Sequence, residues 1–560
     1  MLDEAYGRRP HNASKNPFTC GLSGKTFTGL EMVERVENLA KGLSKEFGWE
    51  PNKGTEWEKV IGIFALNTVD SMTLAYAVHR LSGIASPANA AYSASELEFQ
   101  LKSAGAKALF TCIPLLQTSL EAAKAAGIPN DRVYILEMPK EFSGNEALPF
   151  KTVGQLISEG SKSGKLEQLR WEKGQGARQT AYLCYSSGTS GLPKGVMISH
   201  RNVIANIIQI CLYEKPTRDK RSPENKTEVG LGLLPLSHIY GLVVIAQAST
   251  YRGDGVVILP KFELQSYLYA IETQKINTLY LVPPIIIQMA KNQVACKKVD
   301  LSSVNCVFTG AAPLGAETAD ELQKIYPSWK IRQGYGLTET CTVVSSSVEH
   351  DIWFGSSGSL LPGYTAKIVT PDGNDISGYD QPGELVVQSP SVVLGYLNNE
   401  NANKETFIDD TDGKGRWMRT GDEAVFKKGP NGYEHVFIVD RIKELIKVKG
   451  LQVAPAELEA HLLAHPSVAD VAVIPVPDDA AGEVPKAFIV KSSSVGLEEN
   501  DRMVARDIAK HVQDHKARHK WLKGGVEFID VIPKSPSGKI LRRLLRDKEK
   551  ESRRKKGAKL

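Results

Sequence analysis

A segment rich in hydroxyl-bearing residues and glycines lies between Tyr185 and Val196 and reads YSSGTSGLPKGV. Glycines let a backbone approach a phosphate closely, and hydroxyls and backbone amides donate hydrogen bonds to its oxygens. Lys194 adds a positive charge, but the segment is not a Walker A loop, because this lysine follows Pro193 and precedes Gly195. Its composition fits a phosphate-binding loop and a flexible surface loop equally well.

Four further segments follow in order along the chain and favour the phosphate-binding interpretation. They are QGYGLTET at 333–340, WMRTGD at 417–422, VDRIKELIKVKGLQVAPAELE at 439–459 and PKSPSGKIL at 533–541. In this order and spacing, the five segments resemble the adenylate-forming superfamily, which includes acyl-CoA ligases, adenylation domains and beetle luciferases. The resemblance covers about residues 50–545. LPLSHIYG, TGAAPLG and SPSVVLGYLNN are most similar to the 4-coumarate–CoA ligase branch and its fungal peroxisomal aryl- and acyl-CoA ligase relatives.

The chemistry of such enzymes explains why these residue types are needed. A carboxylate is a poor acyl donor, so it first attacks the α-phosphate of ATP to form an acyl-adenylate. The AMP of that adenylate is a good leaving group, which the thiol of coenzyme A displaces. The protein must therefore hold two anions together and stabilise charge on the phosphoryl transition state.

The resemblance implies a set of residues that bind ATP and AMP. The set is Ser186, Ser187, Gly188, Thr189, Ser190, Gly191, Lys194, Gln333, Gly334, Tyr335, Gly336, Leu337, Thr338, Asp422, Arg441, Lys443, Lys447 and Lys539. Within it, the 186–191 loop and Lys194 hold the β- and γ-phosphates, and Thr338 bonds the α-phosphate. Tyr335 stacks on adenine, and Asp422 accepts from the ribose hydroxyls with help from Arg441. Glu339 and Thr189 are the implied ligands of Mg²⁺, a hard cation that prefers oxygen.

Lys539, His238 and Thr338 are the implied catalytic residues. Lys539 corresponds to the lysine that bridges the carboxylate and the α-phosphate, although a surface lysine in a basic region is the ordinary interpretation of its sequence context. His238 matches the histidine near the reacting carboxylate, against the ordinary interpretation of a core histidine.

The 439–459 segment implies that a small domain swings between two half-reactions. We expect a hinge at residues 440–443, with Lys443 at the pivot. Lys449, Gly450 and Gln452 are expected to face coenzyme A, and Lys447 the nucleotide. Lys261 is a further candidate for a coenzyme A phosphate, with an ordinary surface lysine as the alternative.

The expected acid pocket is apolar. Its residues are His238, Tyr240, Phe308, Gly310, Ala311, Ala312, Gly336, Val343 and Val344. Plant coumarate ligases commonly have a lysine where this chain has Phe308, so we expect an apolar aryl or medium-chain acid instead of a hydroxycinnamate. A stand-alone adenylation enzyme that loads a carrier protein, a luciferase-like oxygenase and a non-catalytic relative are the alternatives.

Large α/β domains must position these segments. Apolar runs such as Val60–Leu66, Ala108–Thr111 and Cys306–Thr309 alternate with helical patterns, which predicts parallel sheets with helical crossovers. Short β-rich runs between Thr365 and Phe437 predict a small antiparallel or barrel-like unit. We therefore expect an α/β fold. It comprises a large N-terminal domain (1–439) of parallel α/β subdomains plus the β-barrel-like unit, and a small mobile α+β C-terminal domain (444–545).

Composition excludes several other classes of protein. A net charge of +5 in 560 residues does not suggest a nucleic-acid partner, and the 7 cysteines are scattered, which argues for a reducing compartment. The uncharged stretch Gly230–Tyr251 is long enough to cross a bilayer, but its proline, serine and histidine residues predict a strand followed by a helix. The basic segment 546–560 is expected to fray. It ends Ala558-Lys559-Leu560, a variant of the peroxisomal S-K-L signal, which predicts recognition by the import receptor of that organelle.

Overall fold

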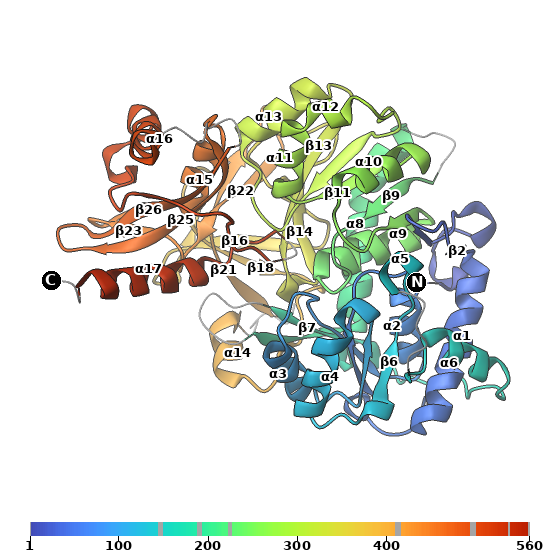
Figure 1. The fold of residues 1–560 in the computed structure, drawn as a ribbon. Helices are drawn as coiled ribbons and strands as arrows, with labels where there is room; N and C mark the ends of the chain where they lie inside the picture. The colour runs from blue at the N-terminus through green and yellow to red at the C-terminus, as the bar shows by residue number, and fades with distance from the viewer. Residues whose placement is uncertain are drawn as a thin grey trace.

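The computed structural model describes residues 2–143, 149–186, 193–221, 227–408, 416–492, 500–535 and 538–557. A large N-terminal domain is followed by a smaller domain at the C-terminal end of the chain, which lies to one side of it (Figure 1). Each domain has its own hydrophobic core: one extensive cluster spans Phe18 to Val436, and a second spans Ile446 to Leu545.

The first sheet of the large domain has seven strands. In spatial order they are β19 (Gly395–Tyr396), β8 (Lys194–Ser199), β7 (Thr180–Ser186), β4 (Ile84–Pro87), β3 (Val60–Phe64), β5 (Ala108–Thr111) and β6 (Val133–Ile135). The strands from β7 to β6 pair in parallel, whereas β8 and β19 are antiparallel additions. β3 and β5 are buried along their whole length, as their continuous apolar runs predict.

The second sheet has nine strands and the same parallel centre. In spatial order they are β15 (Ser359–Leu360), β14 (Thr342–Ser346), β13 (Lys330–Leu337), β12 (Cys306–Thr309), β11 (Thr278–Leu281), β9 (Val229–Gly232), β10 (Gly255–Ile258), β1 (Phe18–Cys20) and β2 (Thr26–Phe27). β12 has the bounds predicted from sequence.

A third, antiparallel sheet completes the large domain and confirms the β-rich unit expected after Thr365. Its strands are β17 (Asp375–Ile376), β16 (Thr365–Val369), β18 (Gly383–Gln388), β21 (Trp417–Lys428), β20 (Phe407–Ile408) and β22 (Glu434–Arg441). β22 pairs with β21 and leads directly into the small domain.

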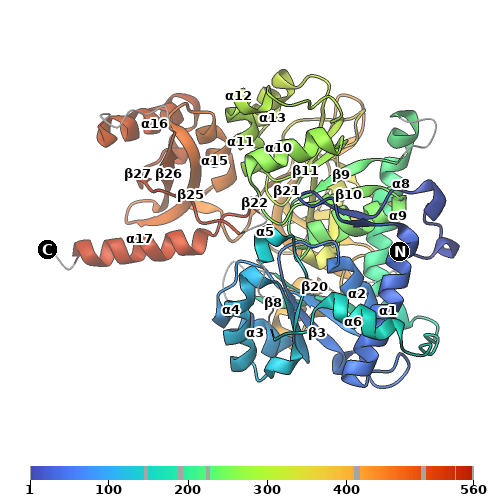
Figure 2. The ribbon, with the colours of Figure 1, turned by 45° about the vertical axis from the view of Figure 1, so that its right-hand side comes forward.

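The small domain has a five-stranded sheet with two helices packed beside it. The strands are β24 (Leu451–Val453), β23 (Ile446–Val448), β26 (Gly482–Lys491), β25 (Val468–Asp478) and β27 (Val526–Phe528). α15 (Pro455–Leu463) contacts both β25 and α16 (Asp501–His515). A third helix, α17 (Arg542–Gly557), starts beside β25 and extends away from the large domain (Figure 2).

The remaining helices belong to the large domain. They are α1 (Gly29–Phe47), α2 (Ser71–Arg80), α3 (Ala94–Ala104), α4 (Leu116–Ala125), α5 (Lys140–Ser143), α6 (Val153–Ser161), α7 (Gln175–Arg178), α8 (His200–Arg221), the π-helix η6 (Tyr240–Ala248), α9 (Ser249–Arg252), α10 (Leu264–Thr273), α11 (Pro283–Lys291), α12 (Gln293–Cys296), α13 (Ala316–Ile325) and α14 (Glu400–Thr406). α8 contacts β7 and β8 of the first sheet and β14 of the second, so it joins the two parallel sheets.

Local signals in the sequence account for several helix ends. Ser93 caps α3 through a reciprocal capping box with Glu96, and Gly105 closes the helix in the left-handed conformation. The uncharged stretch 230–251 forms β9 and then η6 and α9, as expected. No helix in the described parts of the chain combines the length and apolarity that crossing a membrane requires.

Asp440 and Arg441, the first two residues of the expected hinge at 440–443, end β22, where they pair with Glu423 and Asp422 of β21. The turn between the domains begins after Arg441. One expectation about the end of the chain is corrected, because the segment expected to fray from residue 546 is helical to Gly557, where it continues α17. Glu549 bonds Lys486 and Arg553, and this pairing attaches the middle of the helix to the small domain.

Candidate active site

Lys539 lies on a loop of the small domain that reaches the large domain. A bridge between Lys534 and Ile540 closes the loop, and the Lys534 ammonium bonds Asp470 at 2.6 Å. Gly538 has φ +81°, and a Cβ at this position would lie 3.1 Å from the Val282 side chain of the large domain. Only glycine combines that backbone conformation with so close an approach at no steric cost. The loop thus presents Lys539 to the large domain.

The ammonium of Lys539 enters a cluster of charges from both domains. Burial, together with the positive charge of the nearby Arg441, lowers the pKa of Lys539 to about 8. Glu444, Asp422 and Glu339 oppose these effects because their negative charges favour the ammonium form. The structure therefore brings together Lys539, Arg441, Asp422 and Glu339, which the sequence assigned to one site from four separate segments.

Asp422 is held by neighbouring strands and by an aromatic residue. It pairs with Arg441 in the β21–β22 ladder, and its Oδ1 lies 3.6 Å from the Nε of Arg441. The hydroxyl of Tyr335, at the end of β13, donates to Oδ2 at 2.6 Å. Asp422 is 4% exposed, and burial raises its pKa, although Arg441 and Tyr335 oppose that rise. A buried carboxylate with one strong donor already in place is suited to accept further hydrogen bonds from hydroxyl groups.

Glu339 is the centre of a second polar group. Its carboxylate accepts hydrogen bonds from Ser186 at 3.2 Å and from the Tyr396 hydroxyl at 2.8 Å. The Lys194 ammonium lies 4.7 Å from the centre of the Tyr396 ring. The predicted phosphate-binding residues Ser187, Gly188, Thr189, Ser190 and Gly191 lie outside the described residues. Their flanking residues Ser186 and Lys194 pair directly as neighbours on β7 and β8.

The sequence analysis did not identify Tyr396 as a site residue. Its hydroxyl donates to Glu339, and its ring packs against the Lys194 ammonium. It lies in β19, far along the chain from both, and reaches them because β19 pairs with β8. The signal was the GYLNN string of SPSVVLGYLNN, in which no residue was assigned a role.

The QGYGLTET segment forms the end of β13 and the short 3-10 helix η7 (Thr338–Thr340). Gln333 is a structural link, because its amide accepts from Leu314 N at 2.9 Å and donates to Ser356 O at 3.2 Å. The backbone at Gly336 approaches that of Thr342 so closely that a Cβ at 336 would lie 1.5 Å from the Thr342 carbonyl oxygen. Any side chain at position 336 would clash with this backbone, so packing alone requires a glycine here.

Backbone strain is concentrated beside these segments. Ala311, Cys341 and Thr342 have φ values of +66°, +56° and +122°, which non-glycine residues rarely adopt. Such conformations cluster at functional sites because the surrounding structure must hold them in place. Here they lie in TGAAPLG and directly after QGYGLTET.

The residues expected to line the acid pocket come from three adjoining segments. The Tyr240 hydroxyl donates to the Phe308 carbonyl oxygen at 2.7 Å, and the two rings meet edge to face at 5.9 Å. Thr342 donates to Ile239 O at 3.1 Å and so ties the strand of Val343 to the segment of His238. Tyr335 pairs with Ser345, and Gly336 with Val343, so Val344 is the extra residue of a β-bulge.

Phe308 is buried and packs on a charged neighbour. Its ring lies 5.3 Å from the guanidinium of Arg332, and a Cβ at Gly334 would lie 2.7 Å from the ring. Gly310 follows on the same strand end; a Cβ there would lie 3.6 Å from the Tyr240 ring. Ala311 is exposed and Ala312 half-buried, so these two residues form the rim of this region.

His238 precedes the π-helix η6 and is half-buried. Burial, together with the positive charge of Lys539, lowers its pKa to about 4. The imidazole is therefore neutral at pH 7 and can donate or accept a hydrogen bond beside a carboxylate without contributing a charge.

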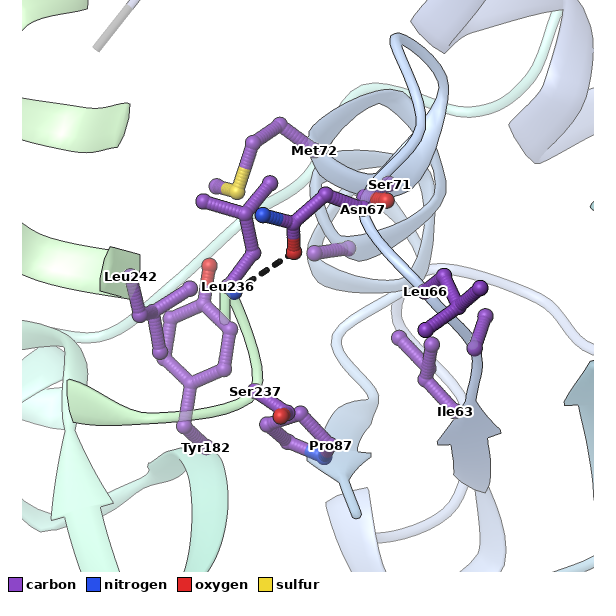
Figure 3. Close-up of a pocket in the computed structure, with 12 residues that line it drawn as sticks. Ile63, Leu66, Asn67, Ser71, Met72, Pro87, Tyr182, Leu236, Ser237 and Leu242 are labelled. Atoms are coloured by element: carbon purple, nitrogen blue, oxygen red, sulfur yellow. Dashed lines mark hydrogen bonds between the residues drawn. The ribbon is translucent and has the colours of Figure 1, made fainter. Parts of the chain in front are cut away.

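An apolar cavity lies on the other side of the His238 segment (Figure 3). It is lined by Ile63, Ala65, Leu66, Asn67, Ser71, Met72, Ala75, Pro87, Tyr182, Leu236, Ser237 and Leu242. Asn67 fixes this wall, because its Oδ1 accepts from Leu236 N at 2.8 Å and its amide donates to Leu234 O at 2.9 Å. The cavity adjoins His238 through Ser237, but the residues expected in the acid pocket are not among those that line it.

The residues expected to contact coenzyme A are not gathered at this site. Lys449 and Gly450 form the tight turn between β23 and β24, with φ values of +51° and +80°, and Gln452 follows on β24. All three are exposed, as is Lys447, whose backbone N–H bonds Glu483 at 2.9 Å. Lys443 lies exposed in the interdomain turn. Lys261 lies on the large domain, with its ammonium 5.3 Å from the Phe142 ring.

Family models match both domains of the chain. The model of the AMP-binding enzyme family matches residues 7–397, and that of the AMP-binding enzyme C-terminal domain matches residues 457–539.

Characterised fungal proteins are similar over almost the full length. The acyl-CoA ligase easD of Emericella nidulans is 44% identical over 96% of this chain and 94% of its own length. The acyl-CoA ligase cm3C of Cordyceps militaris is 41% identical over 96% of this chain and 86% of its own. The acyl-CoA ligase AKT1 of Alternaria alternata is 42% identical over 94% of this chain and 89% of its own length.

Solved structures share the fold. The anthranilate CoA ligase AuaEII in complex with anthranoyl-AMP superposes with a TM-score of 0.80 at 22% identity, covering 98% of this chain and 96% of that one. ATP-bound MatB from Rhodopseudomonas palustris gives a TM-score of 0.77 at 24% identity, covering 96% and 97%.

Proposed function

The chain belongs to the AMP-binding enzyme family, and on that premise we propose that it activates an apolar aryl or medium-chain carboxylic acid with ATP and transfers the acyl group to coenzyme A. The general activity follows from the family and from relatives above 40% identity: the chain is an AMP-forming acyl-CoA ligase. The acid itself is the proposed part.

One observation supports the mechanism most strongly, namely the delivery of Lys539 from the small domain to Asp422, Arg441 and Glu339 of the large-domain site. We assign Lys539 to the α-phosphate and the acid carboxylate, where its charge offsets the repulsion between the two anions. Thr338 donates to the α-phosphate, and neutral His238 orients the carboxylate. The acid oxygen then attacks phosphorus, and pyrophosphate leaves.

The nucleotide is held by the residues around this point. We assign adenine to the face of Tyr335 and the ribose hydroxyls to Asp422, with Arg441 beside them. Ser186 and Lys194 flank the loop that would hold the outer phosphates. Glu339 fits a magnesium ion, because its buried carboxylate is surrounded by oxygen donors, which hard cations prefer. A bound Mg²⁺ would neutralise phosphate charge there.

The second half-reaction needs a different arrangement of the small domain. The thiol of coenzyme A attacks the acyl carbonyl, and AMP leaves. Lys539 then has no carboxylate to bridge, whereas the exposed hairpin carrying Lys449, Gly450 and Gln452 lies on the same domain. We propose that rotation about Lys443 exchanges the Lys539 loop for this hairpin, with Lys447 then facing the nucleotide and Lys261 a coenzyme A phosphate.

Apolar side chains around the acyl region support an apolar acid. Phe308, Val343 and Tyr240 are buried there. Buried surface of this kind rejects polar substituents because they would lose their hydrogen bonds with water.

A panel of acids incubated with ATP and coenzyme A tests this proposal when AMP and thioester are measured together. Unsubstituted aryl and medium-chain acids should yield both products in equal amounts, and ring-hydroxylated acids should yield less. AMP without thioester would indicate an enzyme that loads a carrier protein, and light emission with a luciferin would indicate an oxygenase. A Lys539→Ala variant serves as the control for background hydrolysis of ATP.

We further propose peroxisomal localisation, on the basis of Ala558-Lys559-Leu560, which lie outside the described residues. A fluorescent reporter that carries the last twelve residues should enter peroxisomes, and deletion of the final three residues should leave it in the cytosol. A reporter that remains uniformly cytosolic with the signal intact would contradict the assignment.

A further inference from the structure

Four histidines gather on two helices of the small domain, away from the residues assigned to the nucleotide. His461 lies in α15 and His465 just after its end, whereas His511 and His515 lie one turn apart at the end of α16. Residues four apart on a helix share a face, so His511 and His515 lie on one face of α16. α15 and α16 are in contact, which brings the two pairs together.

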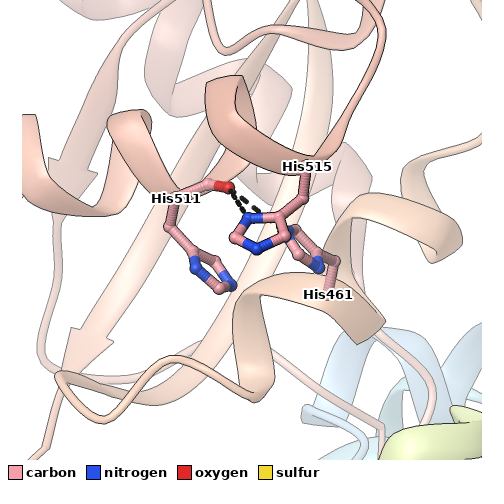
Figure 4. A group of neighbouring side chains, drawn as sticks. All are labelled: His461, His511 and His515. Atoms are coloured by element: carbon pink, nitrogen blue, oxygen red, sulfur yellow. Dashed lines mark hydrogen bonds between the residues drawn. The ribbon is translucent and has the colours of Figure 1, made fainter.

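Three of the imidazoles converge on one small volume (Figure 4). The rings of His461 and His511 are stacked with their centres 4.2 Å apart, and the His515 ring lies 4.9 Å from His511 and 5.3 Å from His461. One ring nitrogen from each residue lies within 4.8 Å of the other two. All three candidate ligands are therefore imidazole nitrogens.

The hydrogen bonding leaves nitrogen lone pairs unused. The Nε2 of His461 and the Nδ1 of His515 both face the carbonyl oxygen of His511, at 3.3 and 2.8 Å. The Nε2 of His511 is buried and has no hydrogen-bond partner in the described part of the chain. Buried polar atoms normally have a hydrogen-bond partner, so this nitrogen is free to bind a water molecule or a metal ion.

We propose that His461, His511 and His515 bind a divalent transition metal of the zinc class, with three imidazole ligands and a water molecule. Imidazole suits zinc, copper and nickel, whereas magnesium prefers oxygen, so this site differs in kind from the one at Glu339. Zinc–nitrogen bonds of about 2.0–2.1 Å require the three nitrogens to move closer together, which rotation of exposed His515 and half-buried His461 allows.

The surroundings favour such a cation. Lys516, which follows α16, places a positive charge near His461, but its ammonium pairs with Glu457 at 3.2 Å. Glu317 of α13, in the large domain, contributes a negative charge near His461. His465 stands behind the group, with its ring 5.1 Å from that of His511 and its Nε2 3.3 Å from Asp507.

Zinc titration of the metal-free full-length protein against a chromophoric chelator tests the proposal. Excess Mg²⁺ is present to saturate oxygen sites, and ATP is omitted. Wild-type protein should bind one equivalent of Zn²⁺ more tightly than the His461→Ala/His511→Ala/His515→Ala variant does. His515→Ala alone should weaken binding at least tenfold, because it removes one of the three ligands. His515 is exposed, so this variant should keep its fold. The matched control is His519→Ala, which removes a nearby histidine outside the group and should leave the affinity unchanged.

Cobalt substitution gives an independent readout. Co²⁺ bound by three imidazoles and water should give visible absorption bands that disappear in the triple variant and persist in His519→Ala. The proposal is overturned if the triple variant binds Zn²⁺ as tightly as wild type, or if neither Zn²⁺ nor Co²⁺ distinguishes the two proteins. Adenylate formation in the triple variant should stay at the wild-type rate, which shows that the small domain still folds and docks.

Discussion

The hydroxyl of Tyr335 donates to the Oδ2 of Asp422 at 2.6 Å, and this bond joins the end of β13 to β21 of the antiparallel sheet. Burial raises the pKa of Tyr335 well above its usual value, and the Asp422 carboxylate raises it further, so the phenol remains the donor. The residue assigned to adenine thus also orients the residue assigned to ribose.

Replacement of Tyr335 by Phe should therefore weaken ATP binding while leaving an aromatic ring for stacking. A hydrogen bond to a charged group contributes about 1.5–3 kcal/mol, so we expect KM for ATP to rise roughly 10- to 100-fold with a smaller change in kcat. Steady-state kinetics with ATP as the varied substrate measures this change. An unaltered KM in Tyr335→Phe together with a raised one in Tyr335→Ala would show that stacking alone matters.

Lys539→Ala should abolish adenylate formation and spare the second step. Removal of one positioned donor from a transition state typically costs roughly 10²–10³-fold in rate, and the burial of Lys539 favours the upper end. Single-turnover assays of acyl-adenylate formation, and of thioester formation from supplied acyl-adenylate, separate the two. If both steps slowed equally, Lys539 would be a general binding or folding residue.

The lowered pKa of Lys539 predicts a pH limit on the first step. The ammonium form is present below a pKa of about 8 and is lost as the pH rises through that value, so kcat/KM for adenylation should fall above about pH 8. Thioester formation from supplied acyl-adenylate should show no such fall. In a Lys539→Arg variant, whose side chain stays protonated, the fall above pH 8 should disappear if the variant retains activity. If the rate still fell in that variant, the decline would have to be assigned to another group.

Lys443→Pro should have the opposite effect to Lys539→Ala. Proline fixes φ at the pivot and restricts Ile442 before it, so the domain should stay in the arrangement seen here. In the described residues, no hydrogen bond involves the Lys443 N–H, whereas those of Ile442, Glu444 and Leu445 are bonded, so the variant should fold. We expect adenylate to accumulate on the enzyme while thioester formation slows at least tenfold. Equal slowing of both half-reactions would argue against domain rotation.

Phe308→Lys should destabilise the protein. The Phe308 ring lies against the Arg332 guanidinium, so a lysine there would bury a second cation beside one that already pairs with Glu214. An uncompensated buried charge lowers the free energy of unfolding by about 3–5 kcal/mol. Thermal unfolding should show a clear loss for Phe308→Lys and a small one for Phe308→Leu, which keeps the site apolar. Phe308→Leu is thus the better variant for testing acid preference.

Much of this protein could be predicted from the sequence, because the relevant physics is local. Helix α3 begins at Ser93 and ends at Gly105 through capping residues within a few positions of each other. The apolar run at Cys306–Thr309 forms β12, because a strand buried on both faces needs continuous hydrophobicity. The roles expected for Tyr335, Asp422 and Lys539 came from the resemblance of their segments to the adenylate-forming superfamily.

Other features depended on pairings between distant parts of the chain. Tyr396 reaches Glu339 only because β19 pairs with β8, and Arg441 lies beside Asp422 because β22 pairs with β21. The segment from residue 546, which was expected to fray, is helical because Glu549 forms an ion pair with Lys486 of β26. The three histidines are separated in sequence and meet only where α15 packs on α16. Such contacts are set by the packing of whole elements, which no local pattern of residues encodes.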